Sequence, residues 1–200
     1  MKRKLSALCS ILLTLSFGIT SAATDSFETY TQPSDRYSYE IAVSNEVWEE
    51  MTYPEKVEAY SISQDLLESM TTPQVVQAVM DYPFLVDLTL FNTTEEGYAH
   101  VLSCSDALQE LVKREDGFMA LVNYYEHMPV PLRDEPGDTS IIELTFAEIL
   151  ISNMAREVVI SEQQFYDLTD TINTKAAEKA KATELYGTEP NLKITGTQPY

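Results

Sequence analysis

Histidine, cysteine and glycine are scarce in this sequence, and each scarcity argues against a class of function. The 200 residues contain two histidines, two cysteines and six glycines. Two histidines without a His-Glu-x-x-His pair argue against a dedicated zinc site. The glycines form neither Gly-x-Gly-x-x-Gly nor Gly-x-x-x-x-Gly-Lys, which argues against a nucleotide cofactor. No Gly-x-Ser-x-Gly turn marks a serine nucleophile. We therefore expect no cofactor, and the sequence assigns no catalytic residue.

Basic residues are also scarce. Thirteen lysines and arginines face 32 aspartates and glutamates, which gives a formal charge of −19. Such a surface repels phosphates and anionic lipids, so nucleic acid and a membrane surface are disfavoured as partners. The hydrophobic content of 44% is ordinary for a globular domain. The acidity is therefore not that of a disordered tail.

The first 23 residues have the three parts of a secretory signal peptide. A basic start at residues 2–4 precedes an apolar run from Leu5 to Ile19, and small residues follow as far as Ala23. The apolar run is about 15 residues long, whereas a membrane-spanning helix needs about 20. We therefore expect export, cleavage near Ala23 and no membrane span in the mature chain.

Cleavage would make the chain more acidic and leave it one cysteine. Three of the 13 basic residues precede the cleavage site and all 32 acidic residues follow it, which leaves 10 against 32 and a formal charge of −22. Cys104 would then have no intramolecular partner, and its apolar neighbours predict a small buried side chain. A mature chain of this length can bury a core as one domain without a disulfide.

The sequence predicts one helical domain between two extended ends. We assign residues 1–23 to the signal peptide, 24–43 to an extended lead-in, 44–187 to the domain and 188–200 to a tail. Within the domain, residues 129–140 contain three prolines and a glycine, which predicts a loop between two helical halves.

Capping signals recur through the domain and predict an all-α fold. Capping boxes at Thr52–Glu55 and Ser161–Gln164 predict helix starts, the first for a helix over 54–60. Further starts are predicted at Ser63, Thr72, Thr94, Ser105 and Asp116. Residues 84–91 fit neither helix nor strand cleanly, and we favour helix. The expected architecture is a compact array of short capped helices with two longer C-terminal helices.

Apolar spacing predicts where the core lies. Residues 141–154 are strongly apolar, and we place their helix at its centre. We expect the tyrosines at the rim of the core and the other aromatic side chains inside it, namely Trp48, Phe84, Phe118 and Phe146. Gly187 suits the positive φ that often ends a helix.

Two groups of residues are candidates for binding. Asp134, Glu135 and Asp138 surround Gly137 and are weak calcium candidates, because carboxylates bind calcium but their spacing is not that of an EF-hand. A solvated acidic loop is the alternative. The sequence also contains 12 tyrosines, a residue common where glycans or peptides are held.

Three short segments stand out between about residues 46 and 127: Met70-Thr71-Thr72, Asp81-Tyr82-Pro83 and Glu110-Leu111-x-x-Arg114. The accompanying positions are Trp48, Tyr53-Pro54-Glu55-Lys56, Ile62, Leu66, Val75-Val76, Asp87, Gly97, Leu108 and Asp116. Together they resemble an uncharacterised family of secreted, helical bacterial proteins. The resemblance implies export, a helical fold and a bacterial source, and it assigns no catalytic residue. The spacing of Glu110 and Arg114 also suits a helix-stabilising ion pair.

These observations favour a non-catalytic binding module that acts outside the cytoplasm. Its expected partner is an extracytoplasmic protein or glycan. The alternative is an extracellular or cell-wall hydrolase that uses carboxylates, although 32 acidic residues offer no reason to select a pair. A concave pocket with converging carboxylates of shifted pKa would favour the hydrolase, whereas a flat apolar or tyrosine-rich patch would favour binding.

Overall fold

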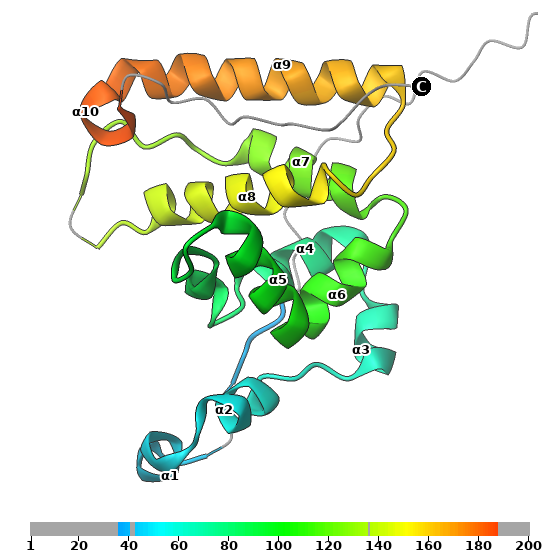
Figure 1. Ribbon diagram of the computed structural model, residues 1–200, viewed down its shortest axis with the longest axis vertical. Helices are drawn as coiled ribbons and strands as arrows, with labels where there is room; N and C mark the ends of the chain where they lie inside the picture. Colours follow the sequence, from blue (N-terminus) through cyan, green and yellow to red (C-terminus); the bar gives the residue numbers. More distant parts are fainter. Residues whose placement is uncertain (1–35, 41–42, 136, 188–200) are drawn as a thin grey trace, which may run out of the picture.

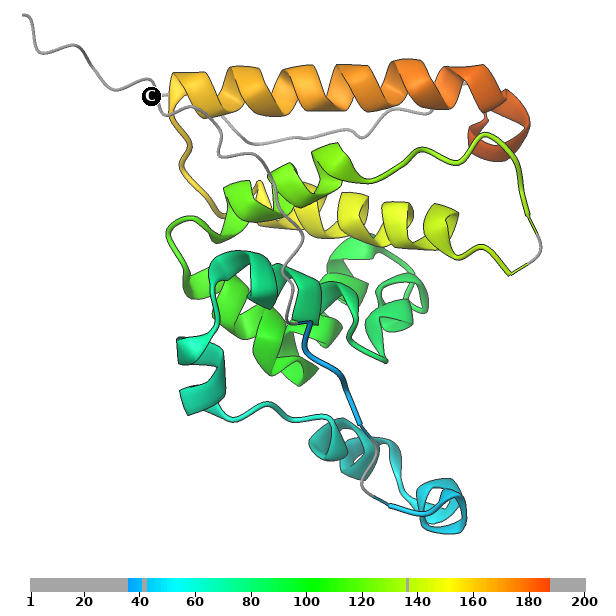
Figure 2. The same ribbon diagram turned by 180° about the vertical axis from the view of Figure 1, so that it is seen from behind.

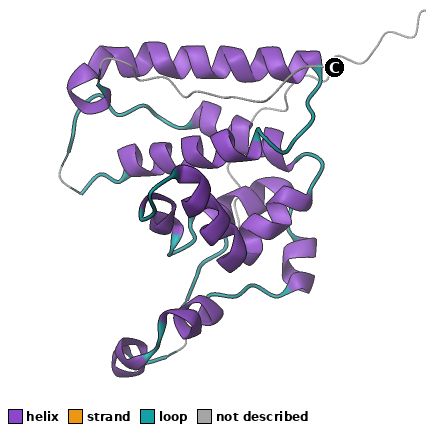
Figure 3. Cartoon of the chain, in the orientation of Figure 1, coloured by secondary structure: helices purple, strands orange, loops and turns teal. Residues whose placement is uncertain are grey.

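The fold is all-α, as the sequence predicts. A computed structural model describes residues 36–40, 43–135 and 137–187, and within these ranges helices are the only regular elements (Figure 3). Predictions for the signal peptide, for the tail and for residues 24–35 and 41–42 lie outside the described residues. Within the described ranges, no helix combines the length and apolar character required to cross a bilayer.

The helices form layers along the length of the molecule. In chain order they are α1 (Asn45–Glu50), α2 (Tyr53–Ala59), α3 (Gln64–Ser69), α4 (Thr72–Met80), the 3₁₀ helix η1 (Leu85–Thr89), α5 (Thr94–Cys104), α6 (Asp106–Lys113), α7 (Gly117–His127), α8 (Ser140–Met154), α9 (Glu162–Lys179), the 3₁₀ helix η2 (Ala180–Ala182) and α10 (Thr183–Tyr186). The long α9 lies at one end, over α7 and α8 (Figure 1). Helices α4 to α6 form the middle, and α1 and α2 project at the far end (Figure 2).

Most predicted helix starts agree with the structure to within one residue. The capping boxes at Thr52 and Ser161 are both formed, and the Ser105 side chain accepts a hydrogen bond from Leu108 N. The start predicted at Thr94 is wrong by one residue, because the preceding Thr93 is the extended residue whose hydroxyl accepts from Glu96 N. Helix α1, capped by Ser44, was not predicted.

Two C-terminal helices are the longest, as expected, but the second is interrupted. Helix α8 has 15 residues and α9 has 18. After α9 the chain continues from Ala180 as the short helices η2 and α10. Gly187 follows with a φ of 77°, a conformation that favours glycine. In residues 84–91 the favoured helix is present only as the short 3₁₀ helix η1.

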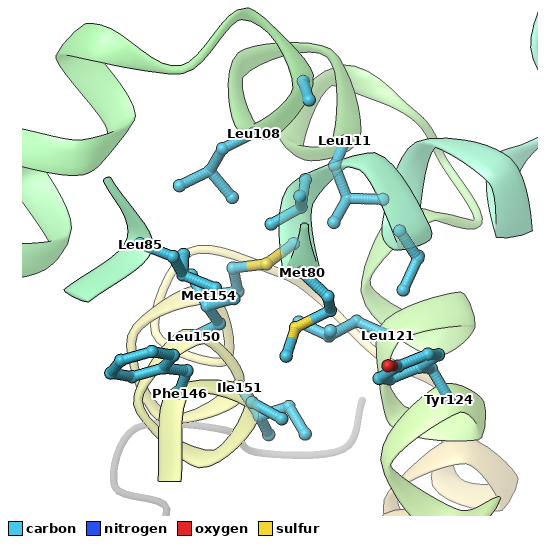
Figure 4. Packing of buried hydrophobic residues seen from close by; sticks show 14 of the residues in the cluster. Met80, Leu85, Leu108, Leu111, Leu121, Tyr124, Phe146, Leu150, Ile151 and Met154 are labelled. Carbon is cyan, nitrogen blue, oxygen red and sulfur yellow. The ribbon is translucent and has the colours of Figure 1, made fainter. Parts of the chain in front are cut away.

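Helix α8 supplies the centre of the core. Its side chains Phe146, Leu150, Ile151 and Met154 meet residues from α4, η1, α6 and α7, as Figure 4 shows. Because α8 buries side chains towards several neighbours, it is apolar around much of its circumference. The placement of this helix at the centre of the core is therefore confirmed.

The predicted division between core aromatics and rim tyrosines is only partly correct. Phe118 and Phe146 are buried, whereas Trp48 and Phe84 are half-buried. Five tyrosines are buried instead: Tyr60, Tyr82, Tyr98, Tyr124 and Tyr125. A tyrosine can enter a core when its hydroxyl finds a partner. The Tyr82 hydroxyl donates to Cys104 O at 3.2 Å, and that of Tyr125 donates to Glu148 Oε1 at 2.6 Å.

Gly97 allows α5 to approach η1 closely. A Cβ atom at this position would lie 2.2 Å from the carbonyl oxygen of Leu88. Carbonyl oxygen and carbon atoms cannot approach so closely, and the oxygen belongs to the backbone. Only glycine therefore permits the observed spacing between the two helices.

Arg114 joins the ends of three helices. Its guanidinium donates to Glu110 Oε1 on α6 at 2.9 Å, and to Leu67 O and Met70 O at the end of α3 at 2.7 and 2.8 Å. It also lies 3.3 Å from the hydroxyl of Thr72, the first residue of α4. The Arg114 and Glu110 side chains are 15% and 11% exposed. The ion pair suggested by their spacing is therefore largely buried, and the same guanidinium adds tertiary contacts to α3 and α4.

Replacing Arg114 should destabilise the protein far more than replacing an exposed arginine. We expect Arg114→Met to lower the free energy of unfolding by about 2–4 kcal/mol, because Glu110 and two carbonyls lose a buried donor. Arg156→Met is the matched control, since it breaks an ion pair with Glu95 whose members are 38% and 48% exposed. That change should cost about 0–1 kcal/mol. Urea unfolding measures both, and equal losses would contradict the assigned role of Arg114.

Gly97→Ala should destabilise the protein even though alanine is the better helix former. Helix propensity alone predicts a gain of about 1 kcal/mol. Contact with Leu88 O should reverse that sign and cost about 1–3 kcal/mol. Ser103→Ala, at an exposed position of α5, is the control and should change stability by less than about 0.5 kcal/mol. A stabilised Gly97→Ala protein in thermal unfolding would disprove the close approach.

Candidate binding surface

Tyr53, Asp87 and His100 meet where α2, η1 and α5 come together. The Tyr53 hydroxyl donates to Asp87 Oδ2 and lies 2.9 Å from His100 Nε2. His100 Nε2 is also 3.5 Å from Asp87 Oδ2. The residue Asp87 is 7% exposed, so its carboxylate is desolvated and depends on these two partners.

Local structure places each of the three side chains. The capping box of α2 fixes Tyr53 at the first helical position, because Glu55 Oε2 accepts from Thr52 N at 2.7 Å. Asp87 lies within the tight 3₁₀ turn of η1. Close packing of α5 at Gly97 brings His100, one turn later, beside that turn.

Burial, together with the hydrogen bond to Asp87, makes Tyr53 a poor acid. Burial and the Asp87 carboxylate raise the pKa of Tyr53 well above its usual range. At neutral pH its hydroxyl is therefore a fixed hydrogen-bond donor, and its ring is held in one orientation. The geometry serves to position an aromatic surface better than it serves proton transfer.

Contacting rings extend from this cluster across the lower half of the molecule. His100 lies 4.8 Å from Phe91 and 5.8 Å from Tyr53, measured between ring centroids. Tyr53 in turn contacts Phe84, which contacts Tyr60 and Tyr82. Tyr60 packs edge-on against Trp48 of α1 at 5.3 Å and against Tyr39 at 5.9 Å. The network links the projecting helices to the core.

One end of the network is exposed and apolar. Tyr53 is 39% exposed and Phe91 42%, and two aliphatic side chains of the segment that includes η1, Val86 and Leu90, are 46% and 67% exposed. We call these four residues and His100 the Tyr53 patch. Scattered single apolar residues are normal on a surface, but Tyr53 and Phe91 both contact the His100 ring and Leu90 directly precedes Phe91, which marks a candidate binding site.

A second polar cluster lies between α7, α8 and α9. Lys179 Nζ and the Tyr125 hydroxyl both donate to Glu148 Oε1. Lys175, 5% exposed, donates to Met128 O at the C-terminal end of α7, and burial lowers its pKa. A cation at this end of a helix opposes the partial negative charge of the unpaired carbonyls. The two lysines therefore hold α9 onto α7 and α8.

A shallow groove of about 320 Å³ adjoins Lys175. Glu126, Met128, Leu132, Glu178 and Lys181 are among the residues that line it. Two other grooves measure about 160 Å³, beside Phe118 and Ile160, and about 330 Å³, beside Arg36 and Tyr39.

Hydrogen bonding lowers the pKa of four carboxyl groups that all serve helix caps or ion pairs: Glu55, Glu95, Glu110 and Asp138.

The sequence candidates have different outcomes. Asp138 Oδ1 accepts from Ser140 N at 2.9 Å and from Ser140 Oγ at 2.6 Å, so it is engaged at the start of α8. Among the described residues, no three His, Cys, Asp or Glu side chains gather closely enough to hold a metal ion. Residue 136 of the same loop lies outside that description, so calcium binding by Asp134, Glu135 and Asp138 stays a prediction. Cys104, expected to be buried, is half-buried.

The Tyr53 patch was missed by the sequence analysis. Tyr53, Asp87 and His100 are separated by 34 and 13 residues, and no spacing rule connects them. The available signal was local: Leu90 and Phe91 follow a strongly apolar segment and precede the polar start of α5.

Comparisons of the chain with protein-family models, curated proteins and solved structures each found no match. The resemblance over residues 46–127 therefore stays a prediction, and function must be inferred from the surface itself.

Tyr53→Phe should destabilise the protein in a pH-dependent manner. Below pH 10 we expect the free energy of unfolding to fall by about 1 kcal/mol, because Asp87 loses a hydrogen-bond donor. The loss is modest because Tyr53 is more than one-third exposed, so solvent weakens the interaction. The wild-type advantage is complete below the tyrosine pKa of the unfolded chain, about 10. It falls as the pH rises further, because the unfolded chain then ionises more readily than the folded one.

The control is Tyr166→Phe. Tyr166 is 58% exposed, and its hydroxyl lies 3.3 Å from Glu162 Oε1 on the same helix. This change should alter stability by less than about 0.5 kcal/mol. Denaturant unfolding at pH 7 and above pH 10 measures both variants. An unchanged stability of Tyr53→Phe at pH 7 would contradict the role of the hydrogen bond to Asp87.

Proposed function

We propose that this protein is exported and acts outside the cytoplasm as a non-catalytic binding module. Its binding surface is the Tyr53 patch. The observation that carries the proposal is the exposure of Tyr53, Leu90 and Phe91 beside a hydrogen-bonded cluster that fixes the ring of Tyr53. Rigid aromatic side chains lose little conformational entropy on binding, which makes them efficient anchors.

The composition of the patch favours a protein partner over a glycan. Sugar rings stack on flat aromatic faces and need several polar groups to orient their hydroxyls. Here the most exposed member is the aliphatic Leu90, and Val86 is also aliphatic. The Asp87 carboxylate, which could orient a sugar, is buried and already bonded to Tyr53. Apolar side chains from a protein would fill this surface better.

The carboxyl groups favour binding over the alternative of a hydrolase. A carboxylic acid that donates a proton at neutral pH needs a raised pKa. Glu95 and Glu110 instead have lowered pKa values, because Arg156 and Arg114 stabilise their charged forms. Each serves as a structural ion-pair partner. Asp87, the buried carboxylate beside the patch, is bonded to Tyr53 and lies beside His100.

Affinity enrichment from the surface extract of the source cells tests the proposal. The bait is the purified protein, compared with a Leu90→Ser/Phe91→Ser variant. We expect a protein partner whose recovery falls at least about tenfold with the variant, since exposed anchors of this kind contribute most of the binding energy. Melting temperatures of both baits establish that the variant remains folded.

The matched control is Leu132→Ser/Val159→Ser. These residues are 53% and 76% exposed and lie in the segments on either side of α8. This control removes two exposed apolar side chains of similar size elsewhere on the surface and should leave recovery unchanged. Equal losses with both double variants would show non-specific adhesion. Enrichment of a glycan that depends on Leu90 and Phe91 would replace the protein partner with a sugar.

A further inference from the structure

Carboxylates flank, in the chain, the segments that form the Tyr53 patch. Glu49, Glu50 and Glu55 flank Tyr53 in the chain, and all three are exposed. Glu95 and Glu96, also exposed, begin α5 just beyond Phe91. Arg156 neutralises only Glu95, through an ion pair of 2.5 Å. The chain on either side of the patch is therefore acidic, and we call Glu49, Glu50 and Glu96 its rim.

The negative charge is concentrated in the projecting helices. Residues 45–59, which we call the arm, form α1 and α2 and contain five glutamates against one lysine. That lysine, Lys56, lies over the ring of Trp48 at 5.3 Å. Neither helix has a buried residue, and all five carboxylates of the arm are exposed. The arm lies at the opposite end of the molecule from α9 (Figures 1 and 2).

The patch is small compared with the interface of two folded proteins. A stable interface takes about 20–30 residues from each partner, whereas the Tyr53 patch has four exposed apolar side chains. That area suits a short segment with two or three apolar anchors. A second copy of this chain is disfavoured as the occupant, because its own charge of −19 would meet the same carboxylates.

We propose that the partner of the Tyr53 patch presents a short apolar segment flanked by lysine or arginine, a cationic amphipathic peptide or an exposed protein segment of that kind. The inference rests on the proposed binding function and names the chemistry of its partner. Leucine-sized side chains of the segment contact Tyr53, Leu90 and Phe91. Its cationic side chains lie against Glu49, Glu50 and Glu96 on the rim. Such an arrangement accelerates association and selects partners by charge.

Three synthetic peptides of equal length separate the two contributions. The first alternates leucine with lysine, the second alternates leucine with glutamate, and the third alternates serine with lysine. Fluorescence anisotropy with the purified protein measures each affinity at low and high salt. We expect the leucine–lysine peptide to bind at least about tenfold more tightly than either of the others, with an affinity that falls as salt screens the rim.

Two double variants locate the charge effect. Glu49→Gln/Glu50→Gln should weaken binding of the leucine–lysine peptide several-fold at low salt and much less at high salt. Both residues are exposed, and folding should not depend on them. Asp170→Asn/Glu184→Gln removes the same charge from exposed positions on α9 and α10. This control should leave the affinity nearly unchanged, since α9 and α10 lie at the end of the molecule opposite the arm (Figure 1) and salt screens charges over long distances.

Each outcome distinguishes the partner chemistry from the binding function itself. Equal binding of the two leucine peptides, abolished by Leu90→Ser/Phe91→Ser, would leave the apolar site in place and overturn the cationic partner. Equal binding of the two lysine peptides would show attraction to charge alone and overturn both proposals. Binding of none of the three would also overturn both. Equal losses of peptide affinity in the two charge variants would show that the rim carboxylates do not contribute specifically to binding.

Discussion

The fold depends on how Arg114 satisfies the backbone carbonyls where α3 ends and α4 begins. The end of every helix leaves carbonyl groups without partners, and a buried end must find donors elsewhere. Here one guanidinium donates to Leu67 O and Met70 O while Glu110 balances its charge. Thr72, beside the same guanidinium, donates to Asp116 Oδ1 at the start of α7 at 2.9 Å. Four short helices thereby share one polar junction, and the apolar packing around α8 can assemble from elements that are individually too short to be stable.

The arm is held by different physics. Helices α1 and α2 have no fully buried residue of their own, and Trp48 of α1 packs half-buried against the edge of the core. They are connected through ring contacts, from Trp48 to Tyr60 and from Tyr53 to Phe84, and through the hydrogen bond between Tyr53 and Asp87. Edge-on ring contacts contribute about 0.5–1.5 kcal/mol each beyond the area they bury. A few such contacts can position two short helices, but they leave the polar and acidic faces of those helices in water. The same few ring contacts therefore position the arm and leave most of its surface exposed.

Local chemistry explains which features could be predicted. A helix cap depends on only three or four adjacent residues, so the helix starts at Thr52, Ser105 and Ser161 were predictable. Helix α8 was predictable from its apolar composition. Helix α1 was missed because its serine cap is followed by no apolar period. Tyr82 was misplaced because its hydroxyl is satisfied by a distant acceptor, Cys104 O, which the sequence around Tyr82 does not reveal. The Tyr53 patch combines three segments that come together through the close approach at Gly97. A single glycine in a helix does not predict which backbone segment will pack against it.

The acidity of the chain and its exposed apolar patch constrain each other. An apolar surface around Tyr53, Leu90 and Phe91 would ordinarily promote self-association, because burying it against another copy is favourable. Two copies that approach through this surface must bring the carboxylates of the arm and of α5 together, and like charges at an interface cost several kcal/mol. The charge therefore keeps the patch open without covering it. The same repulsion becomes attraction for a partner of opposite sign. The charge that disfavours nucleic acid and anionic lipid thus suits the proposed partner, a segment whose apolar side chains match the patch and whose cationic side chains match the carboxylates.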